Sequence, residues 1–540
     1  MVTQVLSKSI ESAFLAIGSC ILIRLASLVG EAYVLRLQTK ELLGLGVRQK
    51  LLFDTLLFLS REAFRKACLS RPPDQKWQGI INLIWLTLPI GLVFSCFFGL
   101  IWIFVLEQPP EEYYTQYKWS ILLMTVNLLF ILAAEPFHVI GQAYLHVKFR
   151  SAVDMYWAIC GPLSNILVVT FVSNYSDRQI WSGITSIIGS ILFLLMHVLY
   201  FWFVLRKQND LMERTTSVNE PDAIPFQSIG EFFPDFRNFA IDQDRWKISW
   251  NLIKQGIFRQ ALMDGEKYMF VGFHLMSIPD QGIYGAIENF MAVPLKLFYV
   301  KMEESTHLYF SQTVTREPLA DRVKEALPTK HLHLLLKTLT LIGCIFVVFG
   351  IPYSHPLLWI YAGDLLIRGS GPLLLKLHMV YIFLLGVNVT SESYVLNALT
   401  SRQLERYNKA MGAVTVIYFT SVFGLSQVFG PPGFVLASIL NLGLRLIYNF
   451  ILIGDRHKGS NFSPLDKLLP KPKVLAALTT AVCLCTSSEF YLYADPPQKM
   501  LYHLSIGILA FLLVGIFVLR HETSLLRSGS TESPLPGPKD

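Results

Sequence analysis

The sequence predicts an all-α polytopic membrane protein with about fourteen transmembrane helices, built as two six-helix lobes plus two C-terminal helices. Composition is the first reason. Of 540 residues, 53% are hydrophobic and 16% are charged, against roughly 45–50% and about 25% in soluble domains. The grouping of the apolar residues is the second reason. Residues 80–106, 179–205 and 338–363 contain no Lys, Arg, Asp or Glu, and each exceeds the ~20 apolar residues that span a bilayer.

Further apolar runs of spanning length follow one another along the chain. The run from 410 to 444 is free of charge but contains Gly430, Pro431, Pro432 and Gly433, which cannot continue a helix. We therefore expect two spans there. The expected helices are 10–35, 51–66, 80–106, 119–143, 152–173, 180–205, 248–273, 282–310, 332–353, 373–399, 408–428, 432–453, 474–492 and 499–519.

The distribution of positive charge predicts the orientation of these spans. If the N-terminus is cytosolic, the cytosolic loops and helix ends hold 30 of the 46 Lys and Arg, and the opposite side holds 9. Because cytosolic loops carry an excess of Lys and Arg, both termini are expected in the cytosol. The sequon at Asn174 then lies in a short loop on the far side, where it is a candidate for glycosylation.

The longest hydrophilic segment divides the first twelve spans into equal halves, as in transporters with internal repeats. We expect a first lobe, a cytosolic linker, a second lobe, a cytosolic loop, two additional transmembrane helices, and a cytosolic tail that is disordered. These segments cover residues 1–205, 206–247, 248–453, 454–473, 474–519 and 520–540, in that order.

Several predicted spans contain ionisable residues, which are costly in a bilayer and indicate function. In the second span, Asp54, Arg61 and Arg65 have the spacing of one helical face, and Arg259 and Glu266 share a face in the seventh span. We expect the cations to line a cleft between the lobes that suits an anionic ligand, since Arg is the preferred partner of phosphate. The predicted cleft cations are Arg24, Arg61, Arg65, Lys254, Arg259 and Lys296.

The alternative is that these charges only hold the bundle together as ion pairs. Glu62 and Lys66, four residues apart, are one such expected pair. The two hypotheses, a ligand-binding cleft and structural ion pairs, differ in whether each cation is permanently paired with a carboxylate. The acidic partners available in the same spans are Asp54, Glu62, Glu135, Glu266 and Glu288.

Other classes of function are excluded by what the sequence lacks. The charge of +7 is scattered over many loops, so no nucleic-acid partner is expected. The sequence contains no GxxxxGK[ST] phosphate loop, and its seven cysteines show no CxxC spacing. We therefore expect no nucleotide, cofactor, metal or enzyme activity. Because Arg24 interrupts the first apolar run, which is too long for a signal peptide, the first helix is expected to remain uncleaved.

The segment Arg61–Ser70 (REAFRKACLS) resembles the second-span block of the Rft family, the oligosaccharide translocation proteins of the endoplasmic reticulum. Similar blocks follow in the family's order over nearly the whole chain. They are Glu135–Phe137, Asp280–Tyr284, Met302–Ser305, Gly369–Pro372, Arg406–Asn408 and Gly433–Arg445. One departure is Lys296, where the family usually has Arg; it keeps the charge but loses the bidentate fork.

The resemblance implies the fold of the multidrug/oligosaccharidyl-lipid/polysaccharide exporters and a location in the endoplasmic reticulum membrane. It also implies the flipping of a mannose-rich dolichyl-diphosphate oligosaccharide from the cytosolic to the lumenal leaflet, for protein N-glycosylation. The predicted cations would grip its diphosphate. Two alternatives remain: an accessory protein of that pathway without flippase activity, and an ion-coupled exporter of small molecules. A membrane glycosyltransferase is disfavoured because the predicted lumenal loops are short.

Overall fold

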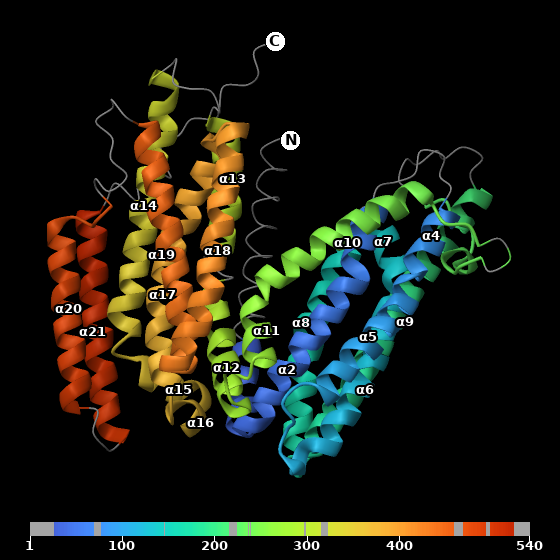
Figure 1. Cartoon of the computed structure of the whole chain (residues 1–540), viewed down its shortest axis with the longest axis horizontal. Helices are drawn as coiled ribbons and strands as arrows, with labels where there is room; N and C mark the ends of the chain where they lie inside the picture. The colour runs from blue at the N-terminus through green and yellow to red at the C-terminus, as the bar shows by residue number, and fades with distance from the viewer. Residues whose placement is uncertain are drawn as a thin grey trace. The chain divides into compact units, whose positions relative to one another are not determined.

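The computed structural model describes residues 26–69, 77–144, 146–214, 224–235, 237, 239–295, 299–314, 322–457, 468–492 and 497–522. In these segments the regular secondary structure is entirely helical (Figure 1). The chain forms two compact units, residues 1–285 and 286–540. Each unit is described by itself.

The first unit begins with a helix over residues 26–36. Its further elements are α2 (Lys40–Leu57), the π-helix η1 (Phe58–Glu62), α3 (Ala63–Cys68), α4 (Gln78–Trp85), α5 (Thr87–Phe104), α6 (Glu111–Ala133), α7 (Glu135–Ala143), α8 (Val147–Phe171), α9 (Arg178–Arg214), the 3-10 helix η2 (Ile229–Phe232), α10 (Gln243–Met263) and α11 (Gly265–Gly272). Helix α6 packs against α5 and α9, α8 against α9, and α10 against α3. A core of aromatic side chains, with Phe137 stacked on Phe232 at a centroid distance of 4.8 Å, joins α7, α9 and η2.

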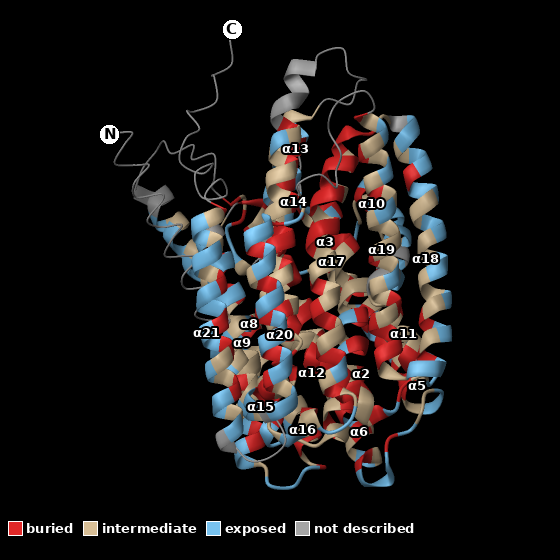
Figure 2. Ribbon diagram, turned by 90° about the vertical axis from the view of Figure 1, so that its left-hand side faces the viewer, coloured by how far each residue is buried: buried red, intermediate tan, exposed pale blue. Residues whose placement is uncertain are grey.

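The second unit begins within α12 (Ile278–Pro294). Its other helices are α13 (Val300–Thr313), α14 (Arg322–Gly350), α15 (Ser354–Ala362), α16 (Asp364–Ile367), α17 (Gly371–Ala398), α18 (Ser401–Phe429), α19 (Pro431–Arg456), α20 (Pro472–Leu492) and α21 (Pro497–His521). Helix α17 packs against α13, α14 and α19, whereas α20 packs against α21 and α14. Half of the most apolar window of α17 is buried, against 11% for α18, and Figure 2 shows α18 as largely exposed.

Each of the fourteen predicted spans overlaps a helix in the described residues, with non-helical residues at some of the ends and at Leu86, Ala134 and Asp264. Within the described residues, ten helices are long and apolar enough to cross a membrane. Many of their large apolar side chains are exposed, including Phe104 (67%) and Phe171 (77%). Soluble proteins rarely expose so much apolar surface, which a bilayer covers. The chain is therefore a multi-pass membrane protein, while the count of fourteen spans and the two six-helix lobes stay predictions.

The ten helices found in the described residues do not include the first, second, seventh and eighth predicted spans, which contain the six predicted cations. The first is described only from residue 26. The second is helical throughout and the seventh is helical apart from Asp264 and Phe273, and both are rich in charge. The eighth is described on both sides of residues 296–298. The polar sequence of the second and seventh spans is the reason that composition alone does not mark these two as spans.

The predicted break within residues 410–444 is confirmed. Helix α18 ends at Phe429 and α19 begins at Pro431. Between them Gly430 has a φ of 62°, a backbone conformation that favours glycine. A proline at the first position of α19 costs no hydrogen bond, because that N–H has no partner within the helix.

Candidate functional site

Three of the predicted cations cannot be placed in a site. Arg24 and Lys296 lie outside the described residues, as does the side chain of Arg259, whose backbone belongs to α10. The remaining three, Arg61, Arg65 and Lys254, all belong to the first unit.

Arg61 and Arg65 converge on one buried carboxylate, that of Glu135 at the start of α7. The Nη2 and Nε atoms of Arg65 donate to its two oxygens at 2.5 and 3.0 Å. Nη1 of Arg61 donates to the same Oε1 at 3.3 Å. The side chain of Glu135 is 3% exposed, whereas those of Arg61 and Arg65 are 22% and 20% exposed. The structure thus brings together two predicted cations and one predicted acidic partner.

This arginine–glutamate cluster (Arg61, Arg65 and Glu135) keeps one uncompensated positive charge, because two guanidinium groups share a single carboxylate. Arg65 donates hydrogen bonds to both carboxylate oxygens of Glu135 through its planar guanidinium group, whereas Arg61 donates one long hydrogen bond. The Nε of Arg61 is buried and has no hydrogen-bond partner in the part of the chain that the structure describes. A buried unsatisfied donor costs about 1–3 kcal/mol. Arg61 is therefore the member of the cluster with donors left for an additional anion.

The π-helical turn η1 changes the geometry that the sequence predicted for this span. It lies between Asp54 and Arg65 and contains Arg61. A π-turn adds a residue to the α-helical repeat, so the spacing of seven and eleven residues does not put Asp54 on the face of the arginines. Asp54 instead lines a cavity formed with α6, α8 and α9. The prediction of one shared face is corrected accordingly.

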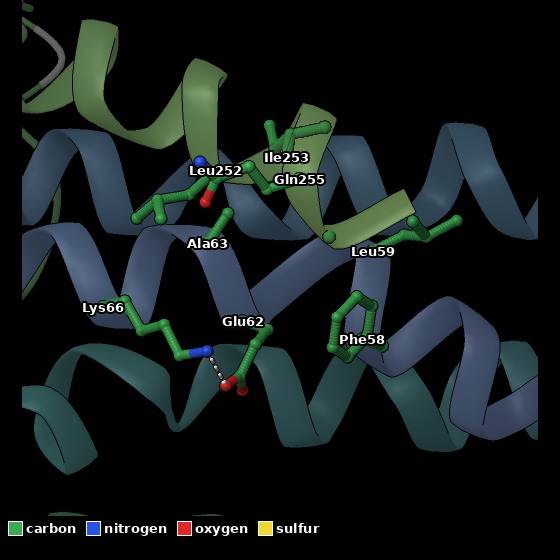
Figure 3. Close-up of a pocket in the computed structure, with 9 residues that line it drawn as sticks. Phe58, Leu59, Glu62, Ala63, Lys66, Leu252, Ile253 and Gln255 are labelled. Atoms are coloured by element: carbon green, nitrogen blue, oxygen red, sulfur yellow. Dashed lines mark ion pairs between the residues drawn. The ribbon is translucent and has the colours of Figure 1, made fainter. Parts of the chain in front are cut away.

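The predicted pairing of Glu62 with Lys66 is confirmed, at 3.0 Å. Both side chains line a small pocket of about 190 Å³ between the η1–α3 segment and α10 (Figure 3). Its other walls are mainly apolar and include Phe58 and Leu252. The two side chains are 31% and 46% exposed, so the pair is a weak, solvated contact.

The seventh predicted span is interrupted at Asp264, between α10 and α11. Because the side chain of Arg259 lies outside the described residues, its sharing of one face with Glu266 stays a prediction. Glu266 accepts a hydrogen bond from the hydroxyl of Tyr284. Lys254 lies on an exposed part of α10, with its Nζ 5.6 Å from the centre of the Trp250 ring. A cation–π contact of this kind leaves the ammonium group open to an anion.

The last predicted acidic partner, Glu288, is half-buried in the part of α12 that belongs to the second unit. The candidate glycosylation site Asn174 is exposed in the loop between α8 and α9. Its amide donates to Asp177 at 2.9 Å and its oxygen accepts from Ser176 at 3.0 Å. Its modification stays a prediction. Among the described residues, no group of His, Cys, Asp or Glu has an arrangement that could hold a metal ion.

Sequence reasoning missed a buried arginine in the first unit. Arg48 is 1% exposed and binds Glu107 through the carboxylate at 2.6 Å and the backbone carbonyl at 2.8 Å. Its Nε donates to Gln281 at 2.8 Å. Arg48 precedes the second predicted span, which begins at residue 51. Helix α2 begins at Lys40, so Arg48 is a further charge inside a helix.

Sequence reasoning also missed a polar network in the second unit. Arg445 of α19 donates to Glu392 of α17 at 2.5 Å, and the amide of Asn388 donates to the same carboxylate at 3.0 Å. Asn449 then links Asn388 to Tyr407 of α18, through bonds of 3.3 and 3.2 Å. The sequence does contain an indication of this network, because Glu392 and Arg445 are charged residues within apolar runs.

Comparisons with known proteins agree with this architecture. The sequence profile of the family described as "Rft protein" matches residues 8–531. The "Man(5)GlcNAc(2)-PP-dolichol translocation protein RFT1" of Xenopus tropicalis is 30% identical, over 97% of each chain. The proteins of the same name from Mus musculus and Drosophila melanogaster are each 29% identical, over 90% and 94% of this chain and 90% and 95% of theirs.

A solved structure, "Lipid II flippase MurJ, inward closed conformation", superposes with a TM-score of 0.61. The alignment covers 94% of this chain and 99% of that one, at 14% sequence identity. At this identity the likeness concerns the fold alone. The chain therefore shares the fold of that structure, and the sequence resemblance noted above is confirmed by the family profile. This chain belongs to the Rft protein family.

Proposed function

We propose that this protein moves a mannose-rich dolichyl-diphosphate oligosaccharide from the cytosolic to the lumenal leaflet of the endoplasmic reticulum membrane. The glycolipid would then be available for protein N-glycosylation. Relatives that align over nearly their whole length are named as translocation proteins for Man(5)GlcNAc(2)-PP-dolichol. The flippase-like fold fits this task. Both termini are expected in the cytosol, as the charge bias predicts.

The arginine–glutamate cluster is the observation that best supports a diphosphate ligand. It holds a positive charge beyond what Glu135 neutralises, on a helix that lies among membrane spans. An isolated cation in mid-membrane costs about 2.5–3.5 kcal/mol on insertion scales. A diphosphate group would offset this cost through charge-assisted hydrogen bonds to Arg61. Lys254, which has no carboxylate partner among the described residues, is a second candidate contact.

The competing function is an accessory role in the same pathway without transport. It is favoured by the same cluster, because Arg65 already has a bidentate carboxylate partner. In that case Arg61 and Arg65 would only hold the η1–α3 segment to α7.

Reconstitution separates the two functions. Purified full-length protein is placed in liposomes with the dolichyl-diphosphate oligosaccharide, and the fraction of glycan accessible from outside is followed over time. A flippase shortens the time for exchange between leaflets relative to protein-free liposomes. An accessory protein leaves the exchange at the protein-free rate while still restoring N-glycosylation in cells that lack their own Rft protein.

A further inference from the structure

The first unit contains a second cavity, about 530 Å³ in volume, between α2, α6, α8 and α9. Its volume is within the ~300–1,000 Å³ of typical small-molecule sites. Its walls are unusual for a membrane protein because they are mostly amides, hydroxyls and glycines rather than aliphatic side chains. None of the arginines of the cluster lines it.

Two buried amides in this cavity have unused hydrogen-bonding groups. Gln179 is 7% exposed, and neither its Nε2 nor its Oε1 has a partner among the described residues. Asn127 is 8% exposed and its Oδ1 is likewise unpartnered within the described chain. Both side chains line the cavity, from α9 and α6. Since an unsatisfied buried polar group costs about 1–3 kcal/mol, the two amides point to a polar occupant.

The remaining lining residues narrow the chemical class of that occupant. Lys50 and Asp54 bring opposite charges, so the cavity does not favour a phosphate. A polyprenyl chain would bury the unpartnered amide groups of Gln179 and Asn127 against hydrocarbon. Trp157 is 38% exposed, and the centre of its ring lies 5.0 Å from that of Phe193, which packs against it. The amides and hydroxyls of the cavity can hydrogen-bond to the hydroxyl groups of a neutral ring, and the face of the indole can pack against its C–H groups.

We propose that this cavity binds neutral saccharide units of the transported glycolipid, separately from the diphosphate. The identity of the glycolipid rests on the proposed function, but the affinity of the cavity for a sugar does not. One continuous helical segment, α2–η1–α3, carries both features. Asp54 at the cavity and Arg61 in the cluster are seven residues apart, which is about 10 Å along a helix. Both features therefore lie within a short stretch of one helical segment, on different faces of it.

Binding of the free glycan tests this inference without any transport step. The probe is the Man(5)GlcNAc(2) oligosaccharide released from its lipid and diphosphate, titrated into the full-length protein in nanodiscs by calorimetry. Gln179→Leu and Asn127→Leu each replace an unpartnered amide by an apolar side chain of similar size. Loss of the corresponding hydrogen bonds is expected to weaken glycan binding about tenfold in each variant. Thermal stability should be unchanged or higher, because no protein partner is lost.

Thr87→Val is the matched control. Thr87 in α5 is 1% exposed and its hydroxyl is also unpartnered among the described residues, but it does not line the cavity. Its variant should bind the glycan as the wild type does. If either leucine variant fails to fold, the other and Trp157→Leu provide the same measurement.

The outcomes of this experiment distinguish the proposed saccharide site from the proposed flippase activity. Glycan binding that is weakened in the cavity variants alone supports the saccharide site, even if liposomes show no transport. No glycan binding by the wild type, as expected for a cavity that holds only water, overturns it. Equal binding by wild type and cavity variants also overturns it, and transport in liposomes would then leave the proposed function standing without this site.

Discussion

Substitution of Glu135 and its two arginines by Gln should destabilise the protein to different degrees. Glu135→Gln leaves both guanidinium groups without a carboxylate, and breaking one side of a buried ion pair costs about 3–5 kcal/mol. The arginines are 22% and 20% exposed, so water solvates part of their charge and the lower end, about 3 kcal/mol, applies. Arg65→Gln removes two of the three bonds and should rank second.

Arg61→Gln is the informative variant because it separates stability from function. It removes only the 3.3 Å bond and leaves the two bonds of Arg65 to Glu135 in place. The expected loss of stability is about 1 kcal/mol or less. If Arg61 contacts the diphosphate, precursor delivery should nevertheless slow, and reporter glycoproteins should be under-glycosylated. Lys66→Gln is the control, since it removes a positive charge from the same segment in a solvated pair.

Two measurements on the same variants decide whether Arg61 contributes to stability, to function or to both. Thermal unfolding of the detergent-solubilised protein gives the stability order, and reporter glycosylation in cells that lack their own Rft protein gives the function. A contact between Arg61 and the diphosphate is refuted if Arg61→Gln lowers protein abundance as much as Glu135→Gln, or if it supports glycosylation as well as Lys66→Gln does. Either result would mean that Arg61 serves only to hold the helices together.

Three further predictions test topology and packing. In a cysteine-free background, a cysteine at 174 should react only with reagent on the lumenal side and one at 220 only from the cytosol; labelling of both from one side contradicts the charge-based topology. Gly282→Ala should lower the unfolding temperature, because a Cβ there would lie 2.5 Å from a carbonyl oxygen of α2, and such overpacking costs typically about 1–3 kcal/mol. An unchanged unfolding temperature would show that α2 can move aside. Arg445→Gln should destabilise the protein by about 1.5–3 kcal/mol through loss of its charged bond to Glu392, and in a double-mutant cycle Glu392→Gln should add little to this loss. Additive effects of the two substitutions would contradict a direct pair.

The sequence predicted the helices well because the bilayer imposes a length and a composition on each span. It could not predict the details that depend on packing. No sequence feature near Asp54 or Arg61 predicts the π-turn η1. The break at Asp264 falls within a segment whose sequence predicts one continuous helix.

Partners between helices were the hardest to predict. The pairing of Arg445 with Glu392 joins residues on α19 and α17 that are 53 positions apart, so it follows from how the helices pack and not from any spacing rule. Arg48 was missed because its helix begins eleven residues before the apolar run that marks the span. The convergence of Arg61 and Arg65 on Glu135 was only partly foreseen: the sequence identified all three residues, but not that two cations share one carboxylate.

The most direct test of the diphosphate site is the affinity of the purified protein for dolichyl diphosphate without its glycan. The lipid is titrated in nanodiscs with the wild type, Arg61→Gln and Lys66→Gln. A hydrogen bond to a charged group contributes about 1.5–3 kcal/mol, so Arg61→Gln should weaken binding about 10- to 100-fold, while Lys66→Gln should bind as the wild type does. Equal affinity of all three proteins for dolichyl diphosphate would contradict a role for the arginine–glutamate cluster in holding the lipid.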